Sequence, residues 1–297
     1  EDVFIYTYSS NNWTQEGRLS RNYVGSHFGT RVRMNDDGDT VSVTARNNTQ
    51  DFSRYERTGV IWSGNGNRIS TNKGKGMDMS SSGNFVAIGN ESYEESGTNE
   101  FNRGMVEVYK VTHTGPYNQA TYTQLSTDLL GTNAYDEFGY NLAMSSPNNT
   151  DGDGLVVAIG SPGYEANFDI NTQNCPFDGD YGKVNIFEYS ASTDSFSSIG
   201  VIYGADVDGV EACDRLTGSS SGSSIDLSDD GTIMAVGANQ ADDGAGAIFI
   251  YQNISDIWSL KYKISGNVDT NFGKTFSLSS DGMKLVTPSY RYAIGKG

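Results

Sequence analysis

A short block of residue types recurs five times along the 297-residue chain, and this recurrence limits the fold more than any other feature. Each block opens on a glycine, and apolar residues follow three and five positions later. That spacing of two is the period of a strand with one buried face. The blocks begin at Phe28-Gly29, Lys73-Gly74, Phe138-Gly139, Ser221-Gly222 and Phe272-Gly273.

A second expected strand follows each block after a tight turn that ends in glycine, such as Asp230-Gly231. These second strands are apolar on both faces, which is typical of a strand enclosed within the structure. They read TVSVTA, FVAIGN, VVAIGS, IMAVGA and KLVTPS. A third strand that begins at glycine and a fourth that carries an aromatic residue complete the unit. In the first repeat, this outer half (GVIWSGNGNRIS) looks short and irregular.

Four antiparallel strands repeated in this way predict an all-β fold, a β-propeller of about five four-stranded blades. One blade is expected to be split between the N- and C-termini. The single domain covers 1–297, with blades at approximately 28–72, 73–137, 138–220, 221–271, and 272–297 completed by 1–27.

The split blade follows from the two chain ends. The fifth block stops after its second strand, whereas residues 1–8 (EDVFIYTY) read as a third strand and Trp13 supplies the fourth-strand aromatic. An inner half-blade alone would leave an unpaired apolar edge, which natural sheets avoid. The N-terminal strands could close the ring of their own molecule or complete a blade of the next one. A fragment of a larger ring is the third alternative, and the start at Glu1 without Met favours an excised or processed segment.

Composition excludes several classes of function. With 37 acidic and 20 basic residues the formal charge is -17, the wrong sign for a nucleic-acid groove or an anionic membrane surface. The 36 glycines and 19% of charged residues do not fit a helical bundle. The longest apolar run, Leu155 to Ile159, is far too short to cross a bilayer. Neither nucleic-acid binding nor membrane insertion is expected.

The order Phe-Gly, apolar pair, Asp-Gly, and a strand ending in Gly-Ala or Gly-Ser-Pro resembles the FG-GAP repeat family over nearly the whole chain. These repeats build the propeller of integrin α-subunits and occur in secreted and surface proteins of bacteria and algae. The resemblance implies an extracellular or cell-surface location, and a face of loops that binds protein or glycan partners. It does not imply one biochemical activity.

The third block has a lengthened turn that places Asn149, Asp151 and Asp153 at alternate positions before Gly154. Ca²⁺ needs several oxygen ligands that converge in one loop, and such turns bind it in EF-hands and, by resemblance, in integrin blades. The first ligand is Asn and an acidic residue further on is replaced by Val157. A calcium site and a solvated hairpin turn therefore both remain as interpretations.

Cys175 and Cys213 fall in loops that a propeller would place on one face, one blade apart. A disulfide between them is expected, with two thiols as the alternative. Five sequons could carry sugar, although chance alone yields about this number. Their asparagines are Asn12, Asn47, Asn90, Asn148 and Asn253.

The loop face also carries the longest insertions, which mix aromatic residues and carboxylates. Long loops on a rigid scaffold are where recognition usually lies. The candidates for partner binding are Tyr93, Glu94, Tyr164, Phe168, Asp169 and Phe177. Solvated loops held down by a few aromatic residues are the alternative.

Catalytic motifs are scarce, since His27 and His113 lie in no spacing typical of a triad or a metal site. The sequence therefore favours a non-enzymatic extracellular structural or adhesion propeller. It could form the repeating subunit of a filament, with strand exchange between neighbours. A glycan-binding propeller and a polysaccharide-degrading enzyme are the alternatives.

Overall fold

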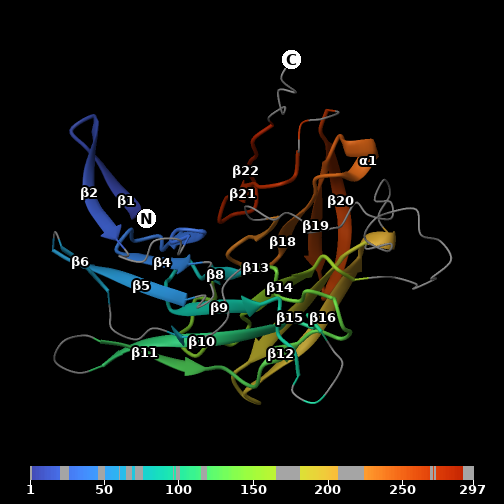
Figure 1. The fold of residues 1–297 in the computed structure, drawn as a ribbon, viewed down its shortest axis with the longest axis horizontal. Helices are drawn as coiled ribbons and strands as arrows, with labels where there is room; N and C mark the ends of the chain where they lie inside the picture. Colours follow the sequence, from blue (N-terminus) through green and yellow to red (C-terminus); the bar gives the residue numbers. More distant parts are fainter. Residues whose placement is uncertain are drawn as a thin grey trace.

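In the computed structural model the sheets follow one another around a common axis, as a propeller's blades do (Figure 1). Helix in the described part of the chain is limited to the short turns η1 (Gly204–Asp206) and α1 (Ala241–Gly244). None of the described helices could cross a membrane. The structure describes residues 2–20, 27–45, 51–59, 61–64, 69–70, 76–95, 97, 101–114, 119–164, 181–206, 224–267, 270 and 272–289.

Four sheets, here called the first to fourth blades, share one topology in which each strand pairs antiparallel with the next along the chain. The first blade contains β3 (Arg31–Met34), β4 (Thr40–Ala45), β5 (Asp51–Thr58) and β6 (Ile61–Gly64), with β7 (Ile69–Ser70) beside β5. The second contains β8 (Met77–Met79), β9 (Phe85–Asn90), β10 (Met105–Thr114) and β11 (Gln119–Gln124), with β12 (Leu129–Leu130) beside β10. The third contains β13 (Asn141–Met144), β14 (Val156–Ser161), β15 (Lys183–Ser190) and β16 (Ser195–Tyr203). The fourth contains β17 (Ile225–Leu227), β18 (Ile233–Ala238), β19 (Ala247–Ile254) and β20 (Ile257–Ser265).

Two further sheets have only two strands each and stand at the two ends of the series (Figure 1). The N-terminal half-blade consists of β1 (Asp2–Ser9) and β2 (Asn12–Ser20). The C-terminal half-blade consists of β21 (Ser277–Leu278) and β22 (Leu285–Val286). The described strands of the two half-blades do not pair with each other.

The expected inner strands are confirmed in the four complete blades, because β4, β9, β14 and β18 coincide with the predicted second strands. The fifth copy, KLVTPS, keeps only the two residues of β22 in strand form. The interpretation of the first repeat was wrong. The third strand of this blade is β5, which lies before the segment GVIWSGNGNRIS. That segment therefore does not contain the whole outer half: it contains the fourth strand, β6, with Trp62 as the aromatic residue.

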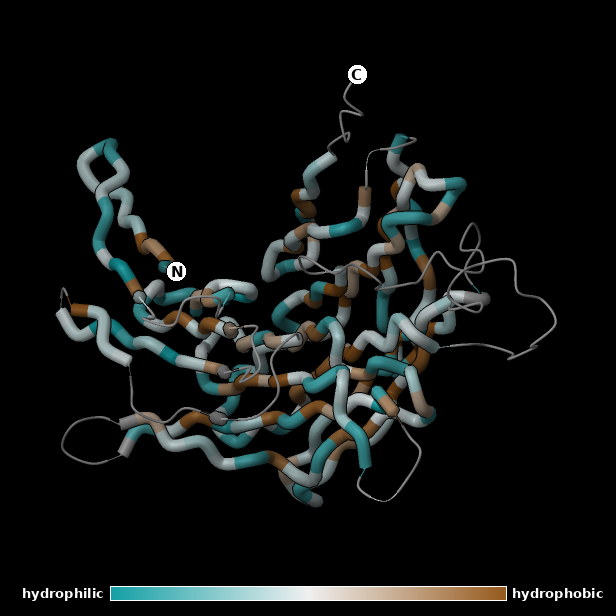
Figure 2. The backbone as a smooth tube through the Cα atoms, viewed as in Figure 1, coloured by the Kyte–Doolittle hydropathy of each residue, from teal (hydrophilic) through white to brown (hydrophobic). Residues whose placement is uncertain are grey.

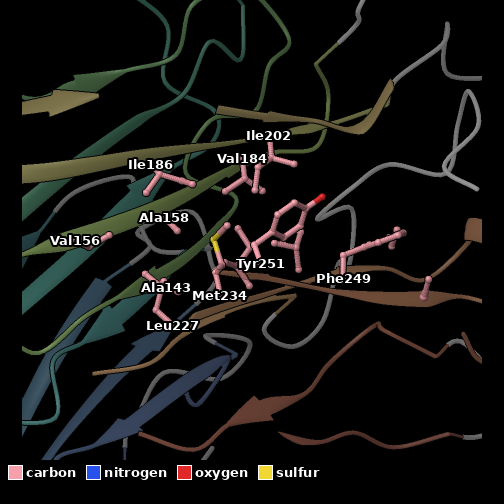
Figure 3. Packing of buried hydrophobic residues seen from close by; sticks show 14 of the residues in the cluster. Ala143, Val156, Ala158, Val184, Ile186, Ile202, Leu227, Met234, Phe249 and Tyr251 are labelled. Carbon is pink, nitrogen blue, oxygen red and sulfur yellow. The ribbon is translucent and has the colours of Figure 1, made fainter. Parts of the chain in front are cut away.

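Apolar residues concentrate on the inner strands (Figure 2). Their buried side chains form clusters that join successive blades. All six residues of β9 and of β14 are buried. Figure 3 shows the layer between the third and fourth blades, where side chains of both blades point toward one another. The third blade contributes Ala143, Val156, Ala158, Val184, Ile186 and Ile202, and the fourth contributes Leu227, Met234, Phe249 and Tyr251.

The repeated glycines have a packing role between blades. A Cβ at Gly89, at the end of β9, would lie well inside van der Waals contact of the carbonyl oxygen of Gly139, in the next blade's opening turn. Gly237, at the end of β18, stands in the same relation to Gly273. The opening turns at Gly139 and Gly273 therefore each rest on the second-strand glycine of the blade before, where only glycine leaves room.

Candidate functional site

The N-terminal half-blade has the internal geometry of the outer half of a blade. Its ladder is interrupted by a bulge between Ile5 and Tyr6. The outer halves of the third and fourth blades carry the same irregularity, after Ile186 and Ile250 respectively. Because bulges fix register and local twist, the shared position identifies β1 as a third strand and β2 as a fourth strand.

The packing of this hairpin agrees with that assignment. The Trp62 ring on β6 lies over Gly17 of β2, 2.7 Å from where a Cβ would be. The fourth blade covers the third in the same way, with Trp258 at 2.8 Å from the Cβ position of Gly200. Ile5 joins the buried cluster of the first blade. The N-terminal half-blade therefore lies where the outer half of a blade preceding the first would lie.

The C-terminal half-blade occupies the complementary place beside the fourth blade. Phe276 is buried in a cluster with Ala235 and Ile248 of that blade. The Asp229 N–H donates to the Ser280 carbonyl at 2.8 Å. The Ser146 N–H donates to the Asp229 carbonyl at the same distance, so successive blades repeat this contact. β21 and β22 are therefore placed beside the fourth blade as the inner strands of the fourth blade are placed beside the third.

The N-terminal half-blade exposes an aromatic face that a complete blade buries. Phe4 and Tyr6 are 49% and 54% exposed. At the equivalent positions relative to the bulge, Phe249 and Tyr251 are 0% and 5% exposed, because the third blade covers them. Trp13, near the hairpin tip, is 65% exposed. This face points toward the side where a preceding blade would pack.

Apolar side chains at the other end of the series also lack a covering sheet. Val286 on β22 is 74% exposed, whereas the equivalent residue of β18, Ala235, is fully buried. Ile264 on β20 is 40% exposed, whereas the equivalent Ile202 on β16 is 8% exposed under the following blade. A following outer half-blade is what these side chains lack. The two ends of the chain are thus complementary in both backbone and apolar surface.

Charged side chains meet near the axis, on the first strands of the blades. Arg33 Nε donates to Asp78 Oδ1 at 2.5 Å, and Asp78 Oδ2 accepts the Met144 N–H at 2.9 Å. Asp226 Oδ2 accepts the Leu278 N–H of β21 at 2.8 Å. Burial raises the pKa of Asp226 to about 6, and the Asp78 carboxylate adds to this rise while Arg33 opposes it.

This raised pKa predicts a pH-dependent stability. The folded state binds the Asp226 proton more tightly than the unfolded chain, so the stabilisation is complete below about pH 4 and is lost as the pH rises through about 6. Asp226→Asn removes this dependence. The stability of the variant relative to wild type should rise by up to about 2 kcal/mol from pH 4 to pH 7 in denaturant titrations. A difference that stays constant with pH would contradict the assignment.

The predicted calcium turn holds its own backbone with the side chains proposed as ligands. Asn149 Oδ1 accepts the Gly152 N–H at 2.8 Å, and Asn149 Nδ2 donates to the Asp153 carbonyl at 2.8 Å. Asp153 Oδ1 accepts the Ala191 N–H at 2.9 Å. Asp151 Oδ1 accepts the Asp153 N–H at 3.3 Å. Among the described residues no group of three or more His, Cys, Asp or Glu could hold a metal ion. Calcium binding stays a prediction, tested by melting with and without a chelator.

The loop-face candidates divide into described and undescribed residues. Tyr164 lies over the Lys183 ammonium, with 4.1 Å from Nζ to the ring centroid, and contacts the Tyr203 ring. Tyr93 is half-buried and its carbonyl accepts the Gly104 N–H, whereas Glu94 is exposed. Phe168, Asp169, Phe177, Cys175 and Cys213 lie outside the described residues. Tyr164 thus has a structural contact that its sequence position did not reveal.

The predicted glycosylation sites differ in accessibility. Asn12 lies on the exposed end of the β1–β2 hairpin and Asn148 is exposed in the lengthened turn. Asn90 is buried at the end of β9, and Asn253 lies within β19 with a buried side-chain oxygen. Asn47 lies outside the described residues. Asn12 and Asn148 are therefore the better-placed acceptors.

Comparison with known proteins identifies the fold and no family. No protein-family model and no curated protein sequence matches the chain. A solved structure of a proposed 6-phosphogluconolactonase from Bacteroides fragilis NCTC 9343 is similar, with a TM-score of 0.51 and 9% sequence identity. The match covers 90% of this chain and 65% of that chain, so this chain spans about two thirds of the length of that protein. At this identity the likeness concerns the fold alone, and the named activity belongs to that protein.

Proposed function

We propose that this protein is a non-enzymatic structural β-propeller outside the cell, in which copies join through their two half-blades. The observation that carries the proposal is the exposure of Phe4, Tyr6 and Trp13 at one end and of Val286 and Ile264 at the other. Soluble monomers rarely leave contiguous apolar patches in water. An unpaired strand edge beside such a patch favours the addition of another strand.

The rest of the molecule supports a role in rigid display. The second strands β4, β9 and β14 are fully buried, and glycine contacts join the second blade to the third and the fourth blade to the C-terminal half-blade. The loops between strands are therefore held by a stiff frame. The FG-GAP resemblance favours the cell surface or the extracellular space, where such frames present loops to protein or glycan partners. Joining copies would repeat one loop face at regular intervals along a filament.

Self-association can be tested by a substitution on the exposed hairpin. Trp13→Ser removes the largest exposed aromatic of the N-terminal half-blade, whose ring contacts Tyr8 at 5.3 Å between centroids. We expect wild-type protein to form particles larger than a monomer as its concentration rises. In light scattering and electron microscopy, the variant should assemble at least tenfold more weakly, which corresponds to a loss of about 1.4 kcal/mol or more.

Ile61→Ser is the matched control, because Ile61 is 67% exposed on β6 of a complete blade. This variant should assemble as wild type does. Wild-type protein that stays monomeric at every concentration would overturn the proposed function. Equal weakening by both substitutions would show that general surface hydrophobicity, and not the half-blade, causes association.

A further inference from the structure

We propose that β1 of one copy adds to the free edge of β22 in a second copy, antiparallel, with Tyr6 opposite Leu285 and Ile5 opposite Val286. This inference rests on the proposed function and specifies its interface. The shared blade would contain an inner half from one molecule and an outer half from the next. Four features of the two half-blades lead to this register and to this occupant.

Among the described strands β22 pairs only with β21, and this pairing defines which of its two edges is free. The Ser279 N–H donates to the Lys284 carbonyl at 2.8 Å, and Ser277 pairs with Val286. Backbone groups alternate between the two edges of a strand, so Lys284 and Val286 face β21. Leu285 and Thr287 therefore offer N–H and C=O groups to a new strand. Met283 offers only its carbonyl, because its N–H donates to Asp281 Oδ1 at 2.9 Å. By the same alternation Pro288 faces the β21 side. Its lack of an N–H therefore removes no hydrogen bond from the free edge.

The free edge of β1 is defined by the hairpin turn. Ser9 pairs with Asn12 across the turn residues Ser10 and Asn11, which both have positive φ. The β19–β20 hairpin of the fourth blade has the same two-residue turn with positive φ. In that hairpin Asn253 is one residue before the end of β19, and its N–H donates to the Thr232 carbonyl beside β18 at 2.8 Å. Tyr8 is the equivalent of Asn253. Tyr8, Tyr6 and Phe4 therefore direct their backbone groups to the free edge.

The register follows from the fourth blade. In that blade Met234 pairs with Tyr251. Met234 is four residues after Asp230, and Tyr251 directly follows the bulge of β19. Leu285 is likewise four residues after Asp281, and Tyr6 directly follows the bulge of β1. A slip by one residue would turn Phe4 and Tyr6 away from the side that lacks a cover. The equivalence therefore places Tyr6 opposite Leu285.

The sequence at the junction favours a second copy over closure of the same ring. Gly17 and Gly200 receive a tryptophan from the following blade, but the equivalent position on β20 is Tyr262, which is 71% exposed. A bulkier residue at this contact would hold the next sheet further away. This spacing favours an open head-to-tail succession over a flat closed ring.

Disulfide trapping distinguishes the occupants. In the proposed register Thr7 lies opposite Lys284, as Gln252 lies opposite Ile233 in the fourth blade. Thr7→Cys and Lys284→Cys are made in separate full-length proteins, which are mixed and oxidised mildly. We expect disulfide-linked dimers, with mass spectrometry locating the bond between residues 7 and 284 and at least tenfold more of it than in the control mixture.

The control mixture pairs Lys284→Cys with Ser9→Cys, which lies two residues further along β1 and is more exposed than Thr7. A stronger link to residue 9 than to residue 7 would overturn the register. A third sample carries Thr7→Cys and Lys284→Cys in one chain. If the bond between residues 7 and 284 forms only within monomers of this double variant, the hairpin closes its own ring and the proposal is wrong. If scattering shows assembly and neither mixture forms a link, the proposed function stands and this interface is wrong.

Discussion

Gly89→Ala is expected to prevent the protein from folding or to destabilise it by at least about 4 kcal/mol. The added methyl group would overlap the carbonyl oxygen of Gly139, which belongs to the backbone of the next blade's opening turn. Backbone atoms cannot move aside as a flexible side chain can, so the two blades would have to separate. Denaturant unfolding of the purified variant, or its absence from the soluble fraction, measures the effect.

Gly64→Ala is the control for this prediction. Gly64 lies on β6, where the nearest atom to an added Cβ is in the Tyr55 ring at 3.4 Å. The change should alter the free energy of unfolding by no more than about 0.5 kcal/mol. If both variants unfold at the same denaturant concentration as wild type, the role assigned to the repeated glycines is wrong.

Lys183→Met should destabilise the protein by about 3 to 5 kcal/mol. The Lys183 ammonium lies 2.9 Å from Asp136 Oδ2, and both side chains are almost completely buried. Without the lysine, the carboxylate loses its counter-charge in a buried place, and its remaining partners among the described residues are the N–H groups of Thr132 and Asn133, at 3.2 and 3.1 Å. Thermal or denaturant unfolding measures the loss.

The double variant Lys183→Met/Asp136→Asn tests the cause. Removal of the second charge should recover most of the lost stability, because Asn can still accept the two backbone N–H groups. If the double variant is as unstable as the two single changes added together, the ion pair is not the source.

The strand order of the complete blades could be predicted because it depends on local patterns. An alternating block, a glycine turn and a continuous apolar strand gave β8 and β9, for example, at nearly their observed bounds. The outer half of the first blade could not be read in this way. Its third strand carries Arg54 and Glu56, which pair with each other at 2.7 Å, so it lacks the apolar pattern of the other third strands.

The half-blades could be predicted as strands, but their surroundings could not. The aromatic residues of β1 and β2 identified an outer half, yet nothing local shows that Trp62 rests on Gly17 or that Phe4 stays exposed. These facts depend on which sheet lies beside which. The available signal was the glycine within the fourth strand, Gly17 in β2 and Gly200 in β16. A glycine inside a strand often marks the close approach of a neighbouring group.

The side-chain roles on the loop face were harder to foresee for the same reason. Tyr164 stands in a long polar insertion, where exposure and recognition are the usual expectation. Its contact with Lys183 depends on a strand that begins nineteen residues later in the chain. The lengthened turn at Asn149 has the residue types of a calcium loop, but hydrogen bonds within the loop use the same oxygens.

Hydrogen exchange as a function of protein concentration tests the central claim most directly. The amides of Tyr6 in β1 and Leu285 in β22 face free edges, so they should exchange quickly in dilute protein. If copies share a blade, the protection of both amides rises together as the concentration increases, while Val157 in β14 remains protected throughout. Protection of Tyr6 and Leu285 that is the same at every concentration would contradict the account.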